Sequence, residues 1–214
     1  MALFARAKVR LWAFVLAVVA ASSVASAQHS ELTEREIVDL YAGRMVVRPD
    51  TVERNGRRYI GGVSYVMIDA SVPQVLDVLD DVRTYRHILP RTRSVRWIGI
   101  ARDGDTIVEL EQGNAVAHGK YVVRIRRNRA EQDMSSSIVR FWLDTRFSHD
   151  INDASGFFHV EAVGEKTRLT YLVMVDLGAG LFGQMFEGRI RRAALSTPML
   201  VKRYVESQKP SPPT

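Results

Sequence analysis

Residues 64–98 read SYVMIDASVPQVLDVLDDVRTYRHILPRTRSVRWI, and this stretch decides the fold. It opens inside a run of β-branched and aromatic residues, 59–68, which is typical of a strand. Ser71 is placed to cap a helix, because Gln74 completes a capping box and Pro73 lies in the first turn, where its missing N–H costs nothing. The helix has one apolar face, formed by Val72, Val75, Leu76, Leu79 and Val82.

A second, shorter helix is expected before Pro90. Tyr85, Ile88 and Leu89 continue the apolar set, and the residue before a proline avoids the helical conformation. A new strand begins beyond this proline, with apolar residues in the range 95–98. Few folds open with a strand, two short helices and a second strand.

These residues resemble the opening of the helix-grip fold of the START / polyketide cyclase / coenzyme Q-binding superfamily (SRPBCC). The resemblance implies an α+β fold, in which a curved antiparallel sheet wraps around a long C-terminal helix and two short helices follow the first strand. The resemblance supports this fold and a ligand pocket more strongly than it supports any particular reaction. The matching residues are Ile68, Asp69, Ala70, Ser71, Val75, Leu79, Asp81, Tyr85, Leu89, Pro90 and Val95.

Residues 1–27 have the parts of a bacterial secretory signal peptide. Three basic residues precede an apolar run, 11–21, and an A-x-A cleavage signal, 25–27. The alternative is a membrane anchor, but a spanning helix needs about 20 apolar residues and this run is shorter. We therefore predict cleavage after Ala27 and a periplasmic or secreted protein.

Composition excludes several kinds of chemistry. The chain has no cysteine, so it can form no disulfide, thiolate metal site or cysteine nucleophile. The formal net charge of +6 includes three basic residues of the signal segment, which leaves 27 basic and 24 acidic residues. This balance argues against nucleic acid as a partner. Arginine clusters at 124–129 and 189–192 are interpreted as solvated faces, with peripheral contact to anionic lipid head groups as the alternative.

The remaining chain is predicted to form one domain with additions at both ends. Residues 28–58 are interpreted as a lead-in, with a helix over 33–42 and a hairpin whose tight turn is Asn55-Gly56. The helix-grip domain is placed at 59–207 and a disordered Pro-rich tail at 208–214.

Strand and helix periods complete the predicted fold. Turn residues after Ile100 separate five or six antiparallel strands. From Leu181 to Glu206 the apolar residues follow a helical period. Pro198 would free the carbonyl of Ala194 and either bend this helix or break it.

The apolar inner faces could be filled core or the wall of a cavity, and periodicity does not separate the two. The resemblance favours a cavity that holds a hydrophobic small molecule or lipid, released by movement of the last helix or of the loops at its N-terminus. Its predicted lining consists of Tyr65, Met67, Tyr121, Val123, Phe141, Phe158, Tyr171, Val173, Phe182, Phe186 and Ile190.

Three polar patterns compete with this interpretation. Gly178, Gly180 and Gly183 spell G-x-G-x-x-G, but no following parallel strand supports a dinucleotide site, so we interpret them as a turn. Glu109 and Glu111 share one strand face and are interpreted as partners of Lys120, Arg124 and Arg126 on the neighbouring strand.

The third pattern is the polar run DTRFSHDIND, 144–153. His149 and Asp150 could bind a metal or activate water, with His118 or His159 as a third ligand, but no metal-ligand spacing is present. We therefore predict neither metal nor cofactor and keep His149 and Asp150 as weak catalytic candidates. The expected function is binding of an apolar ligand. The alternatives are a cyclase or aromatase that acts in the same cavity, and a protein-interaction module.

Overall fold

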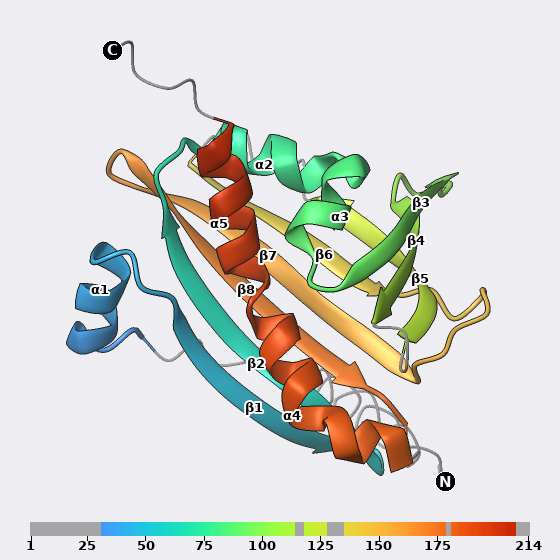
Figure 1. Ribbon diagram of the computed structural model, residues 1–214. Helices are drawn as coiled ribbons and strands as arrows, with labels where there is room; N and C mark the ends of the chain where they lie inside the picture. The colour runs from blue at the N-terminus through green and yellow to red at the C-terminus, as the bar shows by residue number, and fades with distance from the viewer. Residues whose placement is uncertain (1–30, 114–117, 128–134, 179–180, 209–214) are drawn as a thin grey trace, which may run out of the picture. The chain divides into compact units, whose positions relative to one another are not determined.

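Eight antiparallel strands form one sheet in the order β1-β2-β8-β7-β6-β5-β4-β3 (Figure 1). The computed structural model describes residues 31–113, 118–127, 135–178 and 181–208, without the side chains of 181–185. The predicted signal peptide and the tail beyond residue 208 lie outside these ranges. The strands are β1 (Val46–Arg54), β2 (Arg57–Ile68), β3 (Thr92–Ile100), β4 (Thr106–Gly113), β5 (His118–Arg127), β6 (Ser136–Leu143), β7 (Asp153–Val163) and β8 (Lys166–Asp176).

Helices cover one face of this sheet. Figure 1 shows α4 and α5 running across it, with α2 and α3 beside α5. We call the face that these helices cover the inner face and the opposite one the outer face. The helices are α1 (Glu34–Tyr41), α2 (Val72–Asp80), the 3₁₀ turn η1 (Val82–Thr84), α3 (Tyr85–Ile88), α4 (Leu181–Leu195) and α5 (Thr197–Ser207). The predicted α+β helix-grip fold is confirmed.

The helix after β2 begins as its sequence indicates. The Gln74 side chain accepts a hydrogen bond from the Ser71 backbone N–H at 2.9 Å, and the Val75 N–H bonds to the Ser71 carbonyl. Four residues of α2 are buried: Val72, Val75, Leu76 and Leu79. Burial of each such aliphatic side chain contributes roughly 1.5–3 kcal/mol. This burial therefore holds α2 on the sheet.

The predicted lead-in hairpin is part of the sheet. Asn55 and Gly56 both have positive φ, 52° and 72°, as a type I′ turn requires. The turn pairs the whole of β1 with residues 57–65 of β2, and β1 becomes an edge strand. Residues from Glu34 onward form one compact unit. The boundary that we placed between 58 and 59 falls at the start of β2.

The C-terminal helix breaks, which was one of the two outcomes expected at Pro198. Helix α4 ends at Leu195, and α5 starts at Thr197 with Pro198 in its first turn. Proline cannot donate to the carbonyl four residues earlier, which is that of Ala194. The Thr197 hydroxyl donates to this carbonyl instead, at 2.8 Å. The break is therefore compensated by a neighbouring side chain, and α4 is free to take its own direction.

Helix α5 is tied to the end of β2 by polar contacts as well as by burial. The Lys202 ammonium donates to the Met67 carbonyl at 2.9 Å, and the Glu206 carboxylate accepts from the Asp69 N–H at the same distance. Val201 and Val205 are buried against the sheet core. The core thus lies between the inner face and the α2, α3 and α5 helices.

Candidate ligand-binding cavity

A cavity of about 330 Å³ lies between the inner face of the sheet and the helices. Ligand sites in proteins commonly enclose roughly 300–1,000 Å³. Alternation along each strand places every second residue on this wall. The sheet contributes Leu110, Tyr121, Val123, Ile125, Val139, Phe141, Ala154, Phe158, Tyr171, Val173 and Val175, and the helices contribute Leu79, Tyr85, Ile88, Phe186, Ile190, Ala193, Ala194 and Thr197.

An aromatic cluster forms the centre of the sheet wall. The rings of Phe158 and Tyr171 stack with their centroids 4.6 Å apart, and Phe141 lies about 6 Å from each of them. Gly156, opposite Phe141 in the strand pairing, makes room for this ring, because a Cβ there would lie 2.5 Å from it. The cluster gives the wall a broad, rigid apolar surface.

The hydroxyl groups on the cavity wall are engaged within the protein. Tyr85 donates to the Leu79 carbonyl at 2.9 Å, and Tyr121 donates to the Gln112 side chain. The Thr197 hydroxyl donates to the Ala194 carbonyl at 2.8 Å, and the Tyr171 ring stacks on Phe158. Burial raises the pKa of all three phenols above the usual value, so they stay neutral. The inner wall therefore presents apolar surface and satisfied, uncharged polar groups.

Gln112 connects this wall to the turn that follows α3. Its side-chain amide donates to the Pro90 carbonyl at 3.1 Å and to the Thr92 hydroxyl at 3.2 Å. The Gly113 N–H donates to the Arg91 carbonyl at 2.9 Å. These bonds hold the α3–β3 connection against the end of β4, where the cavity wall ends.

Residues 68–197 match the model of the family described as "Polyketide cyclase / dehydrase and lipid transport". The chain belongs to this family. The matched range starts at the last residue of β2 and ends at the first residue of α5, so it includes every residue that lines the cavity. A search of curated proteins found no match.

Solved structures of START-like proteins have the same fold as this family member. One is a STAR-related lipid transfer protein from Xanthomonas axonopodis, with 15% identity, a TM-score of 0.63 and coverage of 76% of this chain and 93% of that chain. Another is the Zhui aromatase/cyclase from Streptomyces sp. R1128, with 18% identity, a TM-score of 0.54 and coverage of 77% and 96%. The human StarD13 lipid transfer and protein localization domain has 12% identity, a TM-score of 0.55 and coverage of 85% and 100%.

The structure brings together most of the predicted lining residues. Tyr121, Val123, Phe141, Phe158, Tyr171, Val173, Phe186 and Ile190 all line the cavity, while the side chain of Phe182 lies outside the described residues. Whether these residues bind a ligand stays a prediction.

Tyr65 and Met67 do not line the cavity. They lie on the outer face of β2, where their pairing partners in β8 are Thr170 and Arg168. The guanidinium of Arg48 lies 5.8 Å from the centre of the Tyr65 ring. Both side chains are buried all the same, on the face where α1 contacts β2. Apolar composition therefore suggested the wrong face, and their neighbours Val66 and Ile68 belong to the inner core.

Sequence reasoning missed the contribution of β4 and of the short helices. Alternation with the outward Glu109 and Glu111 would have placed Leu110 and Gln112 on the inner face. Tyr85 and Ile88 were expected to be apolar packing residues, and they are both packing and lining residues. The alternation that places Leu110 and Gln112 of β4 on the inner face is visible in the sequence. The packing of α3 beside β4 depends on tertiary structure.

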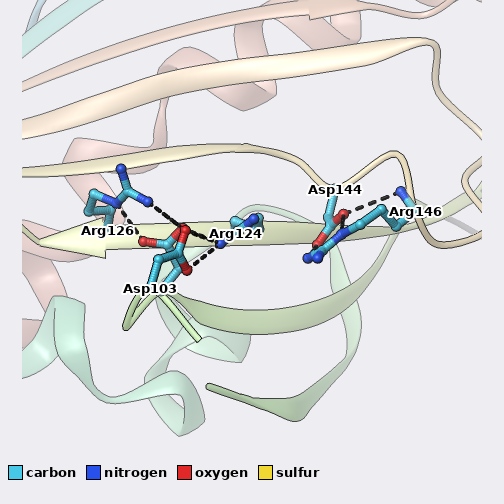
Figure 2. Close-up of polar contacts among 6 residues, drawn as sticks. Asp103, Arg124, Arg126, Asp144 and Arg146 are labelled. Atoms are coloured by element: carbon cyan, nitrogen blue, oxygen red, sulfur yellow. Dashed lines mark hydrogen bonds and ion pairs between the residues drawn. The ribbon is translucent and has the colours of Figure 1, made fainter. Parts of the chain in front are cut away.

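The competing polar patterns have structural partners. Glu109 forms ion pairs with Arg96 at 2.9 Å and Lys120 at 3.2 Å, as expected of a charged outer face. The expectation for Arg124 and Arg126 was wrong, because they pair with Asp103 and Asp105 on the outer face (Figure 2). The described part of the chain holds no cluster of three or more potential metal ligands.

The two weak catalytic candidates occupy the β6–β7 connection. His149 is exposed, and its Nδ1 lies 2.7 Å from the Phe147 carbonyl. The Asp150 carboxylate accepts the Lys120 N–H at 2.8 Å, and Asp150 lies at the cavity rim. Of the G-x-G-x-x-G glycines, Gly178 follows β8 with a φ of 81° and Gly183 is in α4, while Gly180 lies outside the described residues. No helix within the described ranges is long and apolar enough to cross a membrane.

Proposed function

We propose that this protein binds a hydrophobic small molecule or lipid in the cavity between its sheet and helices. The observation that carries the proposal is the cavity wall, in which aromatic and aliphatic side chains surround hydroxyl groups that already have protein partners. Such a wall offers little to a polar solute and much apolar contact area to an apolar one. Membership of a family that includes lipid transport supports the same conclusion.

The packing around the cavity also favours a ligand over a vacant core. Protein interiors are close-packed, and residues that line a void lose contacts on one side. A ligand would supply these contacts to Phe158, Tyr171 and Val173 on the sheet and to Ile190 on α4. Binding would therefore stabilise the fold as well as hold the ligand.

Lipid extraction tests the proposal most directly. Purified protein should carry an extractable apolar compound that mass spectrometry identifies, and it should take up a neutral fluorescent probe such as N-phenyl-1-naphthylamine. Ala193→Trp would fill part of the cavity and should weaken probe uptake by about tenfold or more. Ala162→Trp is the matched control, because Ala162 is exposed and lies outside the cavity lining. A protein with no bound compound and no probe uptake would contradict the proposal.

The cyclase alternative has weaker structural support. It needs a group inside the cavity that can exchange a proton with substrate. His149 is not part of the described lining, and Asp150 is held at the rim by the Lys120 N–H. Substituting both residues by alanine separates the two functions. An enzyme would lose activity and keep its affinity for the ligand, whereas a binding protein would have no activity to lose.

We also infer that the protein acts outside the cytoplasm. The inference rests on the basic, apolar and A-x-A segments of residues 1–27. Protein recovered from the periplasm or the medium should begin at Gln28. An intact N-terminus in the cytosolic fraction would contradict export.

A further inference from the structure

The apolar wall described above ends in a cationic rim. We propose that the cavity selects amphiphiles with an acidic head group, a carboxylate or a phosphate monoester, held at the rim by Arg91 and Arg189. The proposal rests on the binding function proposed above and specifies the class of ligand.

Arg91 and Arg189 are the two arginines among the described residues that line the cavity. Arg96, Arg124 and Arg146 each form an ion pair with an aspartate or glutamate. Arg91 and Arg189 line the cavity, are exposed to solvent, and form no ion pair with a described acidic residue. Two solvent-exposed guanidinium groups on the lining of an apolar cavity are thus accessible to an anion that enters from solvent.

The backbone at Arg91 is held in an unusual conformation. Its φ is 54°, and Asn55 in the type I′ turn is the other non-glycine residue with positive φ within the described ranges. A long side chain seldom adopts this conformation, which costs of order 1–3 kcal/mol. The bonds from Gly113 and Gln112 hold this turn in place against β4. The turn therefore carries Arg91 at a fixed position on the rim.

Arg189 reaches the rim from the helix side. Its guanidinium lies 5.8 Å from the centre of the Phe186 ring, which is itself part of the lining. The nearest acidic residue along the helix, Glu187, is paired with Arg58 of β2 at 3.1 Å. The Arg189 guanidinium therefore lies beside the apolar wall, and Glu187 of the same helix is engaged by Arg58 instead of by Arg189.

Among the described lining residues one carboxylate, that of Asp150, stands against these two guanidinium groups, so the lining keeps a net positive charge. His118 and Asp150 also line the cavity, and the Asp150 carboxylate already accepts the Lys120 N–H at 2.8 Å. The cavity interior offers Tyr85, Tyr121 and Tyr171 as neutral phenols. A ligand with an apolar chain and an anionic head group would place the chain against the apolar interior and the head group beside the arginines at the rim. An anion deep in the cavity would lose its hydration.

Matched twelve-carbon ligands test the charge preference. Displacement of N-phenyl-1-naphthylamine should show that dodecanoate and dodecyl phosphate bind about tenfold more tightly than 1-dodecanol. In the double variant Arg91→Gln/Arg189→Gln this preference should fall below about threefold, while the affinity for 1-dodecanol stays the same. The anion with the larger preference identifies the head group that the rim recognises.

The control is Arg86→Gln/Arg102→Gln, which removes the same charge from two exposed arginines outside the lining. This variant should keep the full preference for the anionic ligands. Equal affinity for anion and alcohol, a preference that survives the rim substitutions, or an equal loss in the control would overturn the inference and leave the proposed binding function intact. Failure of every ligand to displace the probe, or of the probe to bind, would overturn both.

Discussion

The two faces of strand β5 carry different kinds of side chain. Tyr121, Val123 and Ile125 point inward and line the cavity. Arg124 and Arg126 point outward into a network with Asp103 and Asp105 (Figure 2). Both guanidinium groups also lie within 6 Å of the Trp142 ring centre. One face is apolar and incompletely filled, and the other is charged and closely paired.

The charged outer face therefore contributes ion pairs that stabilise the sheet, whereas the apolar inner face leaves space for a ligand. Asp105 is 1% exposed and contacts both arginines, and the neighbouring Asp144 is bound by Arg146 at 2.8 Å. A charge taken from water is tolerated on the outer face because several opposite charges surround it. Among the described residues, the buried part of the cavity wall has no such cluster of opposite charges, so apolar groups and hydrogen-bonded neutral groups are tolerated there. Three substitutions test this contrast.

The largest effect is expected from a charge on the inner face. Val139→Asp places a carboxylate at a position that is 1% exposed, opposite Phe158 of β7 and Arg127 of β5, and the Arg127 guanidinium is already paired with Asp80. The free energy of unfolding should fall by about 4 kcal/mol or more, because an unpaired buried charge is poorly solvated. Urea denaturation followed by circular dichroism measures this loss.

The adjacent residue provides the control for that change. Arg140 is exposed on the outer face, opposite Arg126 in the strand pairing. Arg140→Asp should change the free energy of unfolding by less than about 0.5 kcal/mol. Comparable losses at 139 and 140 would show that the two faces do not differ in the way described.

An intermediate effect is expected from removing a charge on the outer face. Asp105→Asn keeps the shape of the side chain but weakens its bonds to Arg124, which is 17% exposed, and to Arg126. The Arg124 Nε is already buried without a hydrogen-bond partner in the described part of the chain. The free energy of unfolding should fall by about 2 kcal/mol in urea titrations. A smaller loss is expected for Asp103→Asn because that carboxylate is about half exposed, and the opposite order would contradict the assignment of Asp105 as the centre of the network.

The smallest effect is a dependence on pH at Asp144. The Arg146 guanidinium holds the pKa of this carboxyl below its usual value. Since the folded pKa lies below the unfolded one, the ionised carboxylate stabilises the protein above about pH 4, and this contribution is lost as pH falls through the folded pKa. Asp144→Asn should lower stability at pH 7 by less than about 1 kcal/mol, because Arg146 is 60% exposed.

Urea denaturation at a series of pH values from 7 to 2 measures the contribution of the Asp144 carboxylate to stability. The difference in stability between the native protein and Asp144→Asn should shrink as the pH falls below about 4. A difference that stays constant across this range would show that Asp144 contributes by packing rather than by its charge.

Local patterns predicted much of the fold. The Ser71–Gln74 cap, the Asn55-Gly56 turn and the helix ending before Pro90 depend on residues close together in sequence, and all are confirmed. The predicted lining residues of β5 and β8, which are Tyr121, Val123, Tyr171 and Val173, lie on the cavity wall. Tyr65 and Met67 were included as well because β2 is buried on both faces in this region, so its apolar residues do not reveal which face lines the cavity.

The partners of charged residues were harder to predict than the strands themselves. Glu109 was expected to pair with β5, and it does so through Lys120, but its shortest contact is with Arg96 of β3. Arg124 and Arg126 pair instead with the turn before β4. Long side chains reach several neighbours, and only the register of three strands decides which neighbour lies closest.

The sequence by itself determined the order of strands and helices, the caps and turns that bound them, and an apolar face for each, because these follow from backbone preferences and periodicity. Tertiary structure alone decided that α3 and β4 complete the cavity with Tyr85 and Gln112, and that Arg91 and Arg189 both line it. The physical reason is that a cavity is the space left between elements that are distant in the chain. Its size and rim depend on how these elements pack, which no local pattern records.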